Sequence, residues 1–216
     1  SAYEDRLLEW LEGSASANMD SNSVAYSTSY GPPVRPSKRL NEVRQLIKGG
    51  LHDISVSRLR SKVPWALPVP DDDRHSIYVW VDALTNYLTV TGFGNEWGKV
   101  RGNALGDEDE NMGRFWPASC HIIGKDILRF HCVYWPAFLM AAGLPLPRQI
   151  VAHGHWTTNR IKMSKSLGNV VAPKDLIEEW GVDPVRYFFL REANLSTDAD
   201  FSSESIEVRV NSELAD

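Results

Sequence analysis

The spacing of apolar side chains along the chain predicts where helices begin and end. Apolar positions in residues 7–11 follow a helical period up to Gly13, a residue suited to closing a helix. The same period runs through residues 37–48, where Ser37 is the expected N-cap. Between these two helices, residues 13–36 are rich in serine and poor in large apolar side chains, so we expect a mobile segment there.

The middle of the chain alternates short apolar runs with longer helical ones. Strands are expected at residues 77–81, 120–123 and 149–152, with helices at 83–88 and 127–142 between them. Alternation of strands and helices at this spacing is typical of a parallel sheet with crossover helices, so the predicted fold class is α/β. The glycine-rich connection over residues 92–114 is predicted to be a surface loop.

Three further helices are expected after the last strand. Pro173 suits the first turn of one helix and Gly181 suits its end, while residues 183–184 open the next helix. Ser202 or Ser203 is the expected cap of the final helix. The C-terminal region is therefore predicted to be helical.

Composition limits the class of protein. The 216 residues are 43% hydrophobic, with a net charge of −5, which suits one α/β domain with a real core and excludes a small disulfide scaffold. No stretch approaches the roughly 18 apolar residues of a membrane helix, so no membrane partner is expected. Cys120 and Cys132 follow neither metal-ligand nor redox spacing, and we expect no protein-bound metal. The basic residues of segment 35–62 suit either phosphate contact or a solvated helix face.

The segment after the second predicted strand is the first candidate for binding chemistry, because ligands of open parallel sheets lie beyond the carboxyl ends of the strands. Gly124, Lys125 and Asp126 stand there, immediately before a helix. Glycine allows close backbone approach, and both the lysine charge and the free N–H groups of a helix start attract anions. The same tripeptide also forms ordinary turns, so alone it is a weak indication of a phosphate site.

The helix that follows carries a second candidate. Ile127, His131 and Trp135 are four residues apart and therefore share one face. An aliphatic group, an imidazole and an indole suit an apolar ligand with one polar group, and aromatic rings favour contact with a thioether sulfur. Phe130 and Tyr134 begin a similar stripe one position over, so one of the two stripes is ordinary core.

Residues 162–166, in the segment after the third predicted strand, read Lys-Met-Ser-Lys-Ser. Two lysines three positions apart, among small hydroxyl residues, form a cationic loop. Such a loop suits a polyphosphate, because the lysine charges stabilise the negative charge of a departing phosphate. This pentapeptide is a specific motif.

The pentapeptide resembles the signature of class I aminoacyl-tRNA synthetases, which activate an amino acid with ATP and load it onto tRNA. Residues 78–87, 121–127 and 181–192 are similar to the methionyl-tRNA synthetase family within that class. The likeness covers nearly the whole chain apart from the serine-rich segment and the loop at 92–114.

The resemblance implies the second half of a Rossmann-like parallel-sheet catalytic fold over residues 76–171. Residues 1–75 would be the end of the family's connective insertion and the lead-in to that fold. Residues 172–216 would form a helical linking region and the first helix of a truncated anticodon-binding bundle.

The resemblance also implies roles for single residues. The methionine site would consist of Trp80, Ala83, Leu84, Tyr87, Ile127, His131 and Trp135. ATP would bind at Gly124, Lys125, Asp126, His153, Trp156, Lys162, Met163, Ser164, Lys165 and Ser166. Of these, Lys162 and Lys165 would be catalytic, by stabilising the departing pyrophosphate. We expect the two sets to face one common cleft.

The family's first signature, His-Ile-Gly-His, does not occur in this sequence. We therefore expect the chain to be the KMSKS-bearing part of a methionine–tRNA ligase, inactive alone and partnered by an N-terminal half with that signature. Its substrates would be L-methionine, ATP with Mg²⁺, and tRNA(Met). The serine-rich segment and the acidic loop resemble elaborations of mitochondrial forms, so the expected location is the mitochondrial matrix, with the cytoplasm as the alternative.

Two other functions remain open. A non-catalytic, synthetase-derived module that binds tRNA or a partner protein would explain the missing signature, whereas the intact Lys162 and Lys165 oppose it. A Rossmann-like nucleotide binder of unrelated function would not explain why the aromatic set and KMSKS occur together.

Overall fold

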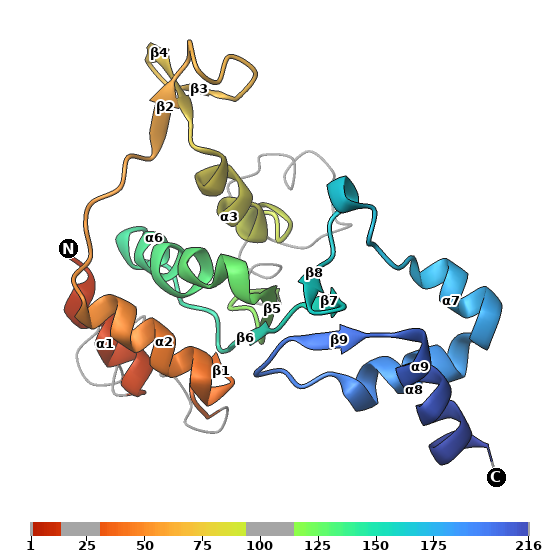
Figure 1. Ribbon diagram of the computed structural model, residues 1–216. Helices are drawn as coiled ribbons and strands as arrows, with labels where there is room; N and C mark the ends of the chain where they lie inside the picture. The colour runs from red at the N-terminus through yellow and green to blue at the C-terminus, as the bar shows by residue number, and fades with distance from the viewer. Residues whose placement is uncertain (1, 14–30, 94–114, 216) are drawn as a thin grey trace, which may run out of the picture. The chain divides into compact units, whose positions relative to one another are not determined.

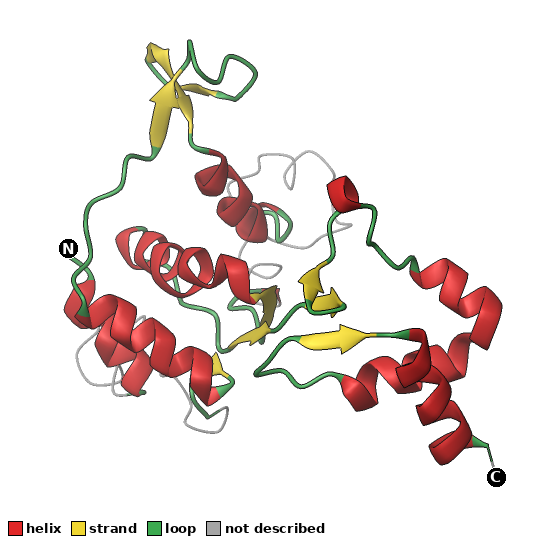
Figure 2. Ribbon diagram, viewed as in Figure 1, coloured by secondary structure: helices red, strands yellow, loops and turns green. Residues whose placement is uncertain are grey.

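The computed structural model describes residues 2–13, 31–93 and 115–215. The chain divides into two compact units (Figure 1). The first unit contains Ser1–His121 and Ile127–Val151, and the second contains Ile122–Asp126 and Ala152–Asp216. Helices and strands alternate along much of the chain, as the α/β prediction requires (Figure 2).

The first unit begins with two helices that contact each other, α1 (Glu4–Glu12) and α2 (Ser37–Lys48). Gly13 ends α1 with a φ of 71°, a left-handed conformation that glycine adopts without strain, so this predicted end is confirmed. The prediction of Ser37 as N-cap is wrong. Pro36 holds the cap position, and Ser37 is the first helical residue, without a side-chain capping bond.

Strand β1 (Val34–Arg35) lies inside the segment that the sequence assigned to a mobile region over residues 13–36. The assignment is wrong at this end. Val34 is fully buried, and β1 pairs in parallel with β6 (Ile150–His153). Two residues are too short to show a period, so the strand gave no pattern. The remainder of the segment, residues 14–30, lies outside the described residues, as does most of the predicted loop at 92–114.

The strand order of this sheet is β1-β6-β5, with β5 at His121–Gly124. Strands β5 and β6 fall at the positions predicted from their apolar runs. The chain passes from one compact unit to the other within both strands. The segments that follow β5 and β6 carry the residues of the candidate site.

The predicted strand at residues 77–81 is wrong. A separate antiparallel sheet has the order β2-β4-β3 and consists of β2 (Ser57–Leu59), β3 (Pro68–Val69) and β4 (Asp72–Ile77). Helix α3 (Val79–Thr89) begins two residues after β4. The β-branched Val79 and Val81 favour a strand locally, but a helical face that buries Leu84 and Leu88 overrides that preference.

The helix after β5 is irregular. It comprises a 3-10 turn (Lys125–Ile127), a π-helical segment (Phe130–Tyr134) and α6 (Trp135–Ala141). Pro136 has no N–H to donate to the carbonyl four residues back, which accounts for the wider turn immediately before it. The widened turn contains His131.

The second unit contains a three-stranded sheet and helices that pack around one apolar core. The sheet has the order β8-β7-β9, with β7 (Trp156–Thr158), β8 (Ile161–Lys162) and β9 (Ala199–Phe201). The helices are α7 (Pro173–Trp180), α8 (Val182–Glu192) and α9 (Ser203–Arg209), followed by a π-helical segment (Val210–Leu214). The core consists of Leu176, Val185, Phe188, Phe201 and Ile206.

The three predicted C-terminal helices are confirmed, and Ser202 caps α9 through a capping box with Ser205. Strand β9 was not predicted. Within residues 2–13, 31–93 and 115–215, no helix has the length and apolarity that crossing a membrane requires.

The core of the second unit can be tested with Phe188→Ala. Phe188 is fully buried, so the change should lower the free energy of unfolding by about 3–5 kcal/mol. Leu190→Ala, on the same helix, is the matched control. Leu190 is 79% exposed, and its loss should change stability by less than about 0.5 kcal/mol. Urea denaturation measures both, and similar costs for the two variants would contradict the core assignment.

Candidate active site

Eight aromatic side chains of the first unit form one contact network, which we call the aromatic cluster. They come from α3, from the segment before β5, from β5 itself and from the irregular helix after it. The members are Trp80, Tyr87, Trp116, His121, Phe130, His131, Tyr134 and Trp135.

Trp80 is a half-buried member of the aromatic cluster. Its indole stacks on Phe130, with ring centroids 3.8 Å apart and planes 14° apart. The same indole is nearly perpendicular to the His131 ring, with ring centroids 6.3 Å apart. Phe130 therefore belongs to the cluster through Trp80, although its sequence stripe also suited ordinary core.

His131 is held by a hydrogen bond at each ring nitrogen. Nδ1 lies 3.0 Å from the carbonyl oxygen of Ile127, which can only accept, so Nδ1 carries the proton. Nε2 lies 2.9 Å from the Tyr87 hydroxyl. Burial lowers the pKa of His131, which favours the neutral ring, and Nε2 then accepts from the hydroxyl. This arrangement fixes both the imidazole and the direction of the tyrosine O–H bond.

His121 is the second buried imidazole of the cluster. Trp135 donates its indole N–H to His121 Nε2 over 3.3 Å, and the Tyr87 ring lies 4.3 Å from the imidazole centroid. Burial, with a smaller contribution from His131, lowers the pKa of His121 to about 4. A neutral imidazole keeps the Nε2 lone pair that the indole N–H requires.

The structure brings four of the seven predicted methionine residues into this cluster: Trp80, Tyr87, His131 and Trp135. Ile127 supplies the carbonyl that orients His131. Leu84 is buried on α3 as core, whereas Ala83 on the same helix is exposed. Sequence reasoning assigned no role to Trp116, His121 or Phe130, although His121 opens one of the segments that carried the family resemblance.

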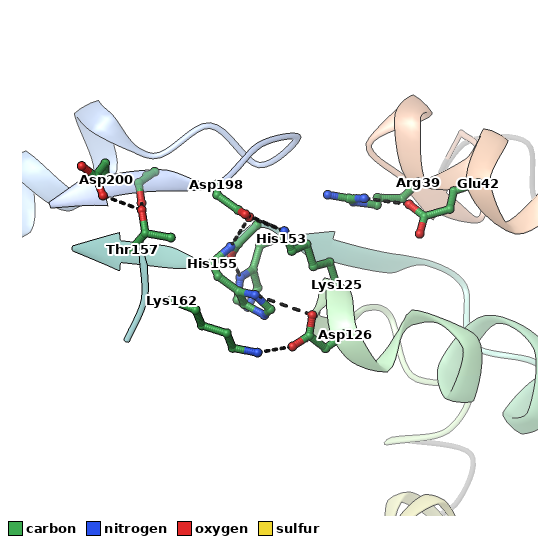
Figure 3. Close-up of polar contacts among 12 residues, drawn as sticks. Arg39, Glu42, Lys125, Asp126, His153, His155, Thr157, Lys162, Asp198 and Asp200 are labelled. Carbon is green, nitrogen blue, oxygen red and sulfur yellow. Dashed lines mark hydrogen bonds and ion pairs between the residues drawn. The ribbon is translucent and has the colours of Figure 1, made fainter. Parts of the chain in front are cut away.

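The second unit contains a cluster of charged side chains, which we call the charged cluster. Its members are Lys125, Asp126, His155, Lys162 and Asp198 (Figure 3). Lys125 Nζ lies 2.6 Å from both carboxylate oxygens of Asp198. The backbone N–H of His155 donates to Asp198 Oδ1 over 2.9 Å.

Asp126 is the other carboxylate of the charged cluster. Lys162 donates a hydrogen bond to Asp126, and His155 Nδ1 lies 3.7 Å from its second oxygen. The bond from Lys162 lowers the pKa of Asp126, and the bond from Lys125 lowers the pKa of Asp198. Both carboxylates are therefore ionised at neutral pH, and each balances one lysine charge.

The remaining KMSKS residues form a capped turn. The Ser164 hydroxyl accepts from the N–H of Leu167 and so caps a 3-10 helix at Lys165–Leu167. The Asn169 amide braces the turn, because its Oδ1 accepts from the Ser164 N–H over 2.8 Å and its Nδ2 donates to the Lys162 carbonyl over 3.3 Å. Ser166 lies 2.6 Å from the Ser164 hydroxyl, and Lys165 is exposed.

Two predicted ATP residues face the core of the second unit. Trp156 and Met163 both pack against the core that contains Phe188, and the Trp156 ring meets Phe189 edge-on at 4.8 Å. His153 Nδ1 lies 2.6 Å from the Gly154 carbonyl.

The backbone of Gly154 passes directly against Thr197. A Cβ atom at Gly154 would overlap the Thr197 carbonyl group. Gly124 has more room, because a Cβ there would lie 3.3 Å from the His155 ring. Asp198, His155 and Asn169 were missed from the sequence. Asp198 in particular lies 73 positions from the lysine it binds, and no local pattern indicates such a contact.

Comparison with known proteins identifies the family. The model of the tRNA synthetases class I (M) matches residues 3–216. The chain belongs to this family. Methionine–tRNA ligase of Rickettsia bellii is 46% identical over 215 residues, which is all of this chain and 36% of that protein. This synthetase chain thus spans about a third of the length of such relatives.

Two further relatives are a protein named mitochondrial and a solved structure with a bound ligand. A probable mitochondrial methionine–tRNA ligase of Schizosaccharomyces pombe is 49% identical over 174 residues, covering 81% of this chain and 30% of that protein. The crystal structure of Mycobacterium tuberculosis methionyl-tRNA synthetase bound by methionyl-adenylate has a TM-score of 0.79 and 45% identity. It matches all of this synthetase chain, which covers 37% of that structure.

The buried imidazoles predict a pH dependence of stability. The folded-state pKa of His121 is about 4, and the unfolded value is near 6.5, so between these values the unfolded chain binds a proton that the folded chain does not. The free energy of unfolding should therefore fall as the pH drops from 6.5, by roughly 3 kcal/mol at pH 4 from His121 alone. His131 shifts in the same direction.

Urea denaturation at several pH values between 7 and 5 measures this slope, above the range in which most carboxylates titrate. His121→Gln should flatten the slope, while the control His52→Gln, at an exposed position, should leave it unchanged. Equal slopes in wild type and His121→Gln would contradict the buried neutral ring.

Proposed function

We propose that the complete protein containing this chain is a methionine–tRNA ligase. The observation that carries the proposal is the 46% identity to a methionine–tRNA ligase over the whole chain, together with the intact KMSKS segment at residues 162–166. The relative bound by methionyl-adenylate supports the same reaction intermediate. The substrates are L-methionine, ATP with its Mg²⁺, and tRNA(Met).

The proposed reaction has two steps. In the first, a carboxylate oxygen of methionine attacks the α-phosphorus of ATP, an O–P bond forms, and the bond to the departing pyrophosphate breaks. In the second, a ribose hydroxyl of the tRNA attacks the methionyl carbonyl, loses its proton and displaces AMP. Neither step needs a side-chain nucleophile, so catalysis rests on orientation and on stabilisation of the pyrophosphate charge.

The aromatic cluster suits the methionine side chain. Aromatic faces contact thioether sulfur favourably. We assign the site to Trp80, Ala83, Leu84, Tyr87, Ile127, His131 and Trp135. The hydrogen bonds of His131 support this assignment, since they satisfy the imidazole and the Tyr87 hydroxyl without placing a charge beside the apolar side chain.

The charged cluster suits the triphosphate. We assign ATP binding to Gly124, Lys125, Asp126, His153, Trp156, Lys162, Met163, Ser164, Lys165 and Ser166. Lys162 and Lys165 are the proposed catalytic residues. Lys162 is bound to Asp126 in this structure and would exchange that carboxylate for phosphate oxygens, whereas Lys165 is exposed on the capped turn. Trp156 and Met163 pack against the core of the second unit, so their proposed contribution to the ATP site is to hold β7 and the KMSKS segment in place.

The proposed compartment is the mitochondrial matrix, supported by the S. pombe relative that is named mitochondrial. Bacterial relatives have similar identity, so the cytoplasm is the alternative. The complete protein carrying a C-terminal fluorescent tag should coincide with a matrix marker in its own cells. Diffuse cytoplasmic fluorescence would contradict the mitochondrial assignment.

The catalytic role of Lys165 can be tested by methionine-dependent ATP–pyrophosphate exchange in the complete protein. Lys165→Ala should lower the exchange rate by about a hundredfold, because the charge that stabilises pyrophosphate is lost, and should leave methionine affinity unchanged. Lys174→Ala, which removes an exposed lysine of α7, is the matched control and should retain the wild-type rate.

Exchange at the wild-type rate in Lys165→Ala would contradict the catalytic role of this lysine. A complete wild-type protein that binds tRNA but catalyses no exchange would instead favour the non-catalytic module.

A further inference from the structure

The turn between β7 and β8 has an unusual backbone. Thr158 pairs with Ile161 and Thr157 with Lys162, so only Asn159 and Arg160 connect the two strands. Both have left-handed φ angles, 53° and 62°. Two-residue hairpin turns of this kind favour asparagine followed by glycine, and an arginine in the second position is strained.

Asp200 holds this turn from the neighbouring strand. It lies in β9 opposite Thr157, since β7 and β9 pair in parallel. Its Oδ1 accepts the Thr157 hydroxyl over 2.5 Å (Figure 3) and the backbone N–H of Arg160 over 2.7 Å. Both bonds lower the pKa of Asp200, so the carboxylate is ionised at neutral pH. One carboxylate oxygen thus connects the strained turn, β7 and β9.

The turn determines where the lysines of residues 162–166 begin. Lys162 is the second residue after Arg160, and its pairing with Thr157 sets which face of β8 its side chain occupies. A slip of one residue in this pairing would move Lys162 to the other face. With only two residues in β8, the ladder itself resists a slip weakly. The bond at Arg160 therefore supplements the bonds from Asn169 to the Lys162 carbonyl and from Lys162 to Asp126 in holding the register.

We propose that Asp200 is a positioning residue for the KMSKS lysines. By fixing the Asn159–Arg160 turn, it keeps Lys162 and Lys165 in the arrangement that pyrophosphate formation needs, without itself contacting a substrate. This inference rests on the proposed function. Asp200 is exposed, so its removal should disturb the hairpin more than the fold.

The test is a double-mutant cycle in the complete protein. Asp200→Ala removes the acceptor, whereas Arg160→Gly relieves the strain that makes the acceptor necessary. The exchange rate of Asp200→Ala should fall about tenfold, as expected for misplaced catalytic groups, with the KM for methionine unchanged. In the Arg160→Gly background, the same change should cost less than about threefold. A purely structural role elsewhere in the fold would not be relieved by glycine at residue 160.

Two further variants sharpen the test. Asp200→Asn keeps an oxygen that accepts the Arg160 N–H and should retain most of the exchange activity. Glu179→Ala, which removes an exposed carboxylate of α7, is the matched control and should retain all of it. An unchanged rate in Asp200→Ala, or an equal loss in both backgrounds, would overturn the proposal.

Amide hydrogen exchange judges the anchor independently of catalysis. The Arg160 amide should exchange at least about tenfold faster in Asp200→Ala than in wild type, because its acceptor is gone. Equal protection would overturn the anchor. A wild-type protein without ATP–pyrophosphate exchange would contradict the proposed function, and the hydrogen-exchange result would still decide whether Asp200 holds the turn.

Discussion

The ion pairs of Lys125 with Asp198 and of Lys162 with Asp126 are the contacts on which the charged cluster depends. Exposed pairs of this kind add little to stability, and both are partly exposed. Their effect is to define where each ammonium group lies. Because neighbouring lysines keep both carboxylates ionised, the cluster is close to neutral without ligand. A polyphosphate would therefore displace a carboxylate from a lysine, instead of binding to lysines that have no anionic partner.

The aromatic cluster, in contrast, contains neutral groups instead of paired charges. Its two imidazoles are neutral, and each has its lone pair committed to a neighbouring donor, Tyr87 in one case and Trp135 in the other. Burial would make a charged ring costly, whereas a neutral ring with satisfied nitrogens costs little. The first unit therefore presents an apolar surface with one oriented hydroxyl, and the second unit presents paired charges.

Much of the fold was predictable because long helices and buried strands repeat an apolar period. The helix at 37–48 and the three C-terminal helices had that period together with Gly, Pro or Ser at their ends. The predicted strand at 77–81 was wrong because β-branched residues stood at the start of a helix, where packing decides. Strands β1 and β9, of two and three residues, are too short for any period to show.

The candidate site was predictable where chemistry is local in sequence. KMSKS and the stripe of Ile127, His131 and Trp135 are visible within a few residues. Asp198 and Asp200 were not visible, because their partners lie about 40 to 70 positions away and a carboxylate near the end of an acidic chain is not distinctive. Both aromatic stripes contribute to the aromatic cluster, which the helix alone could not show, because Trp80 of the neighbouring α3 contacts Phe130 from one stripe and His131 from the other.

The close approach of Gly154 to Thr197 has a consequence for how this region is studied. The peptide before His155 and the peptide before Asp198 are in close backbone contact, so a side chain at residue 154 would require one of these two connecting segments to move away from the other. Scanning mutagenesis would therefore mark residue 154 as essential although it contributes no chemical group. Gly154 would be important because it lets two segments that carry chemical groups approach each other closely.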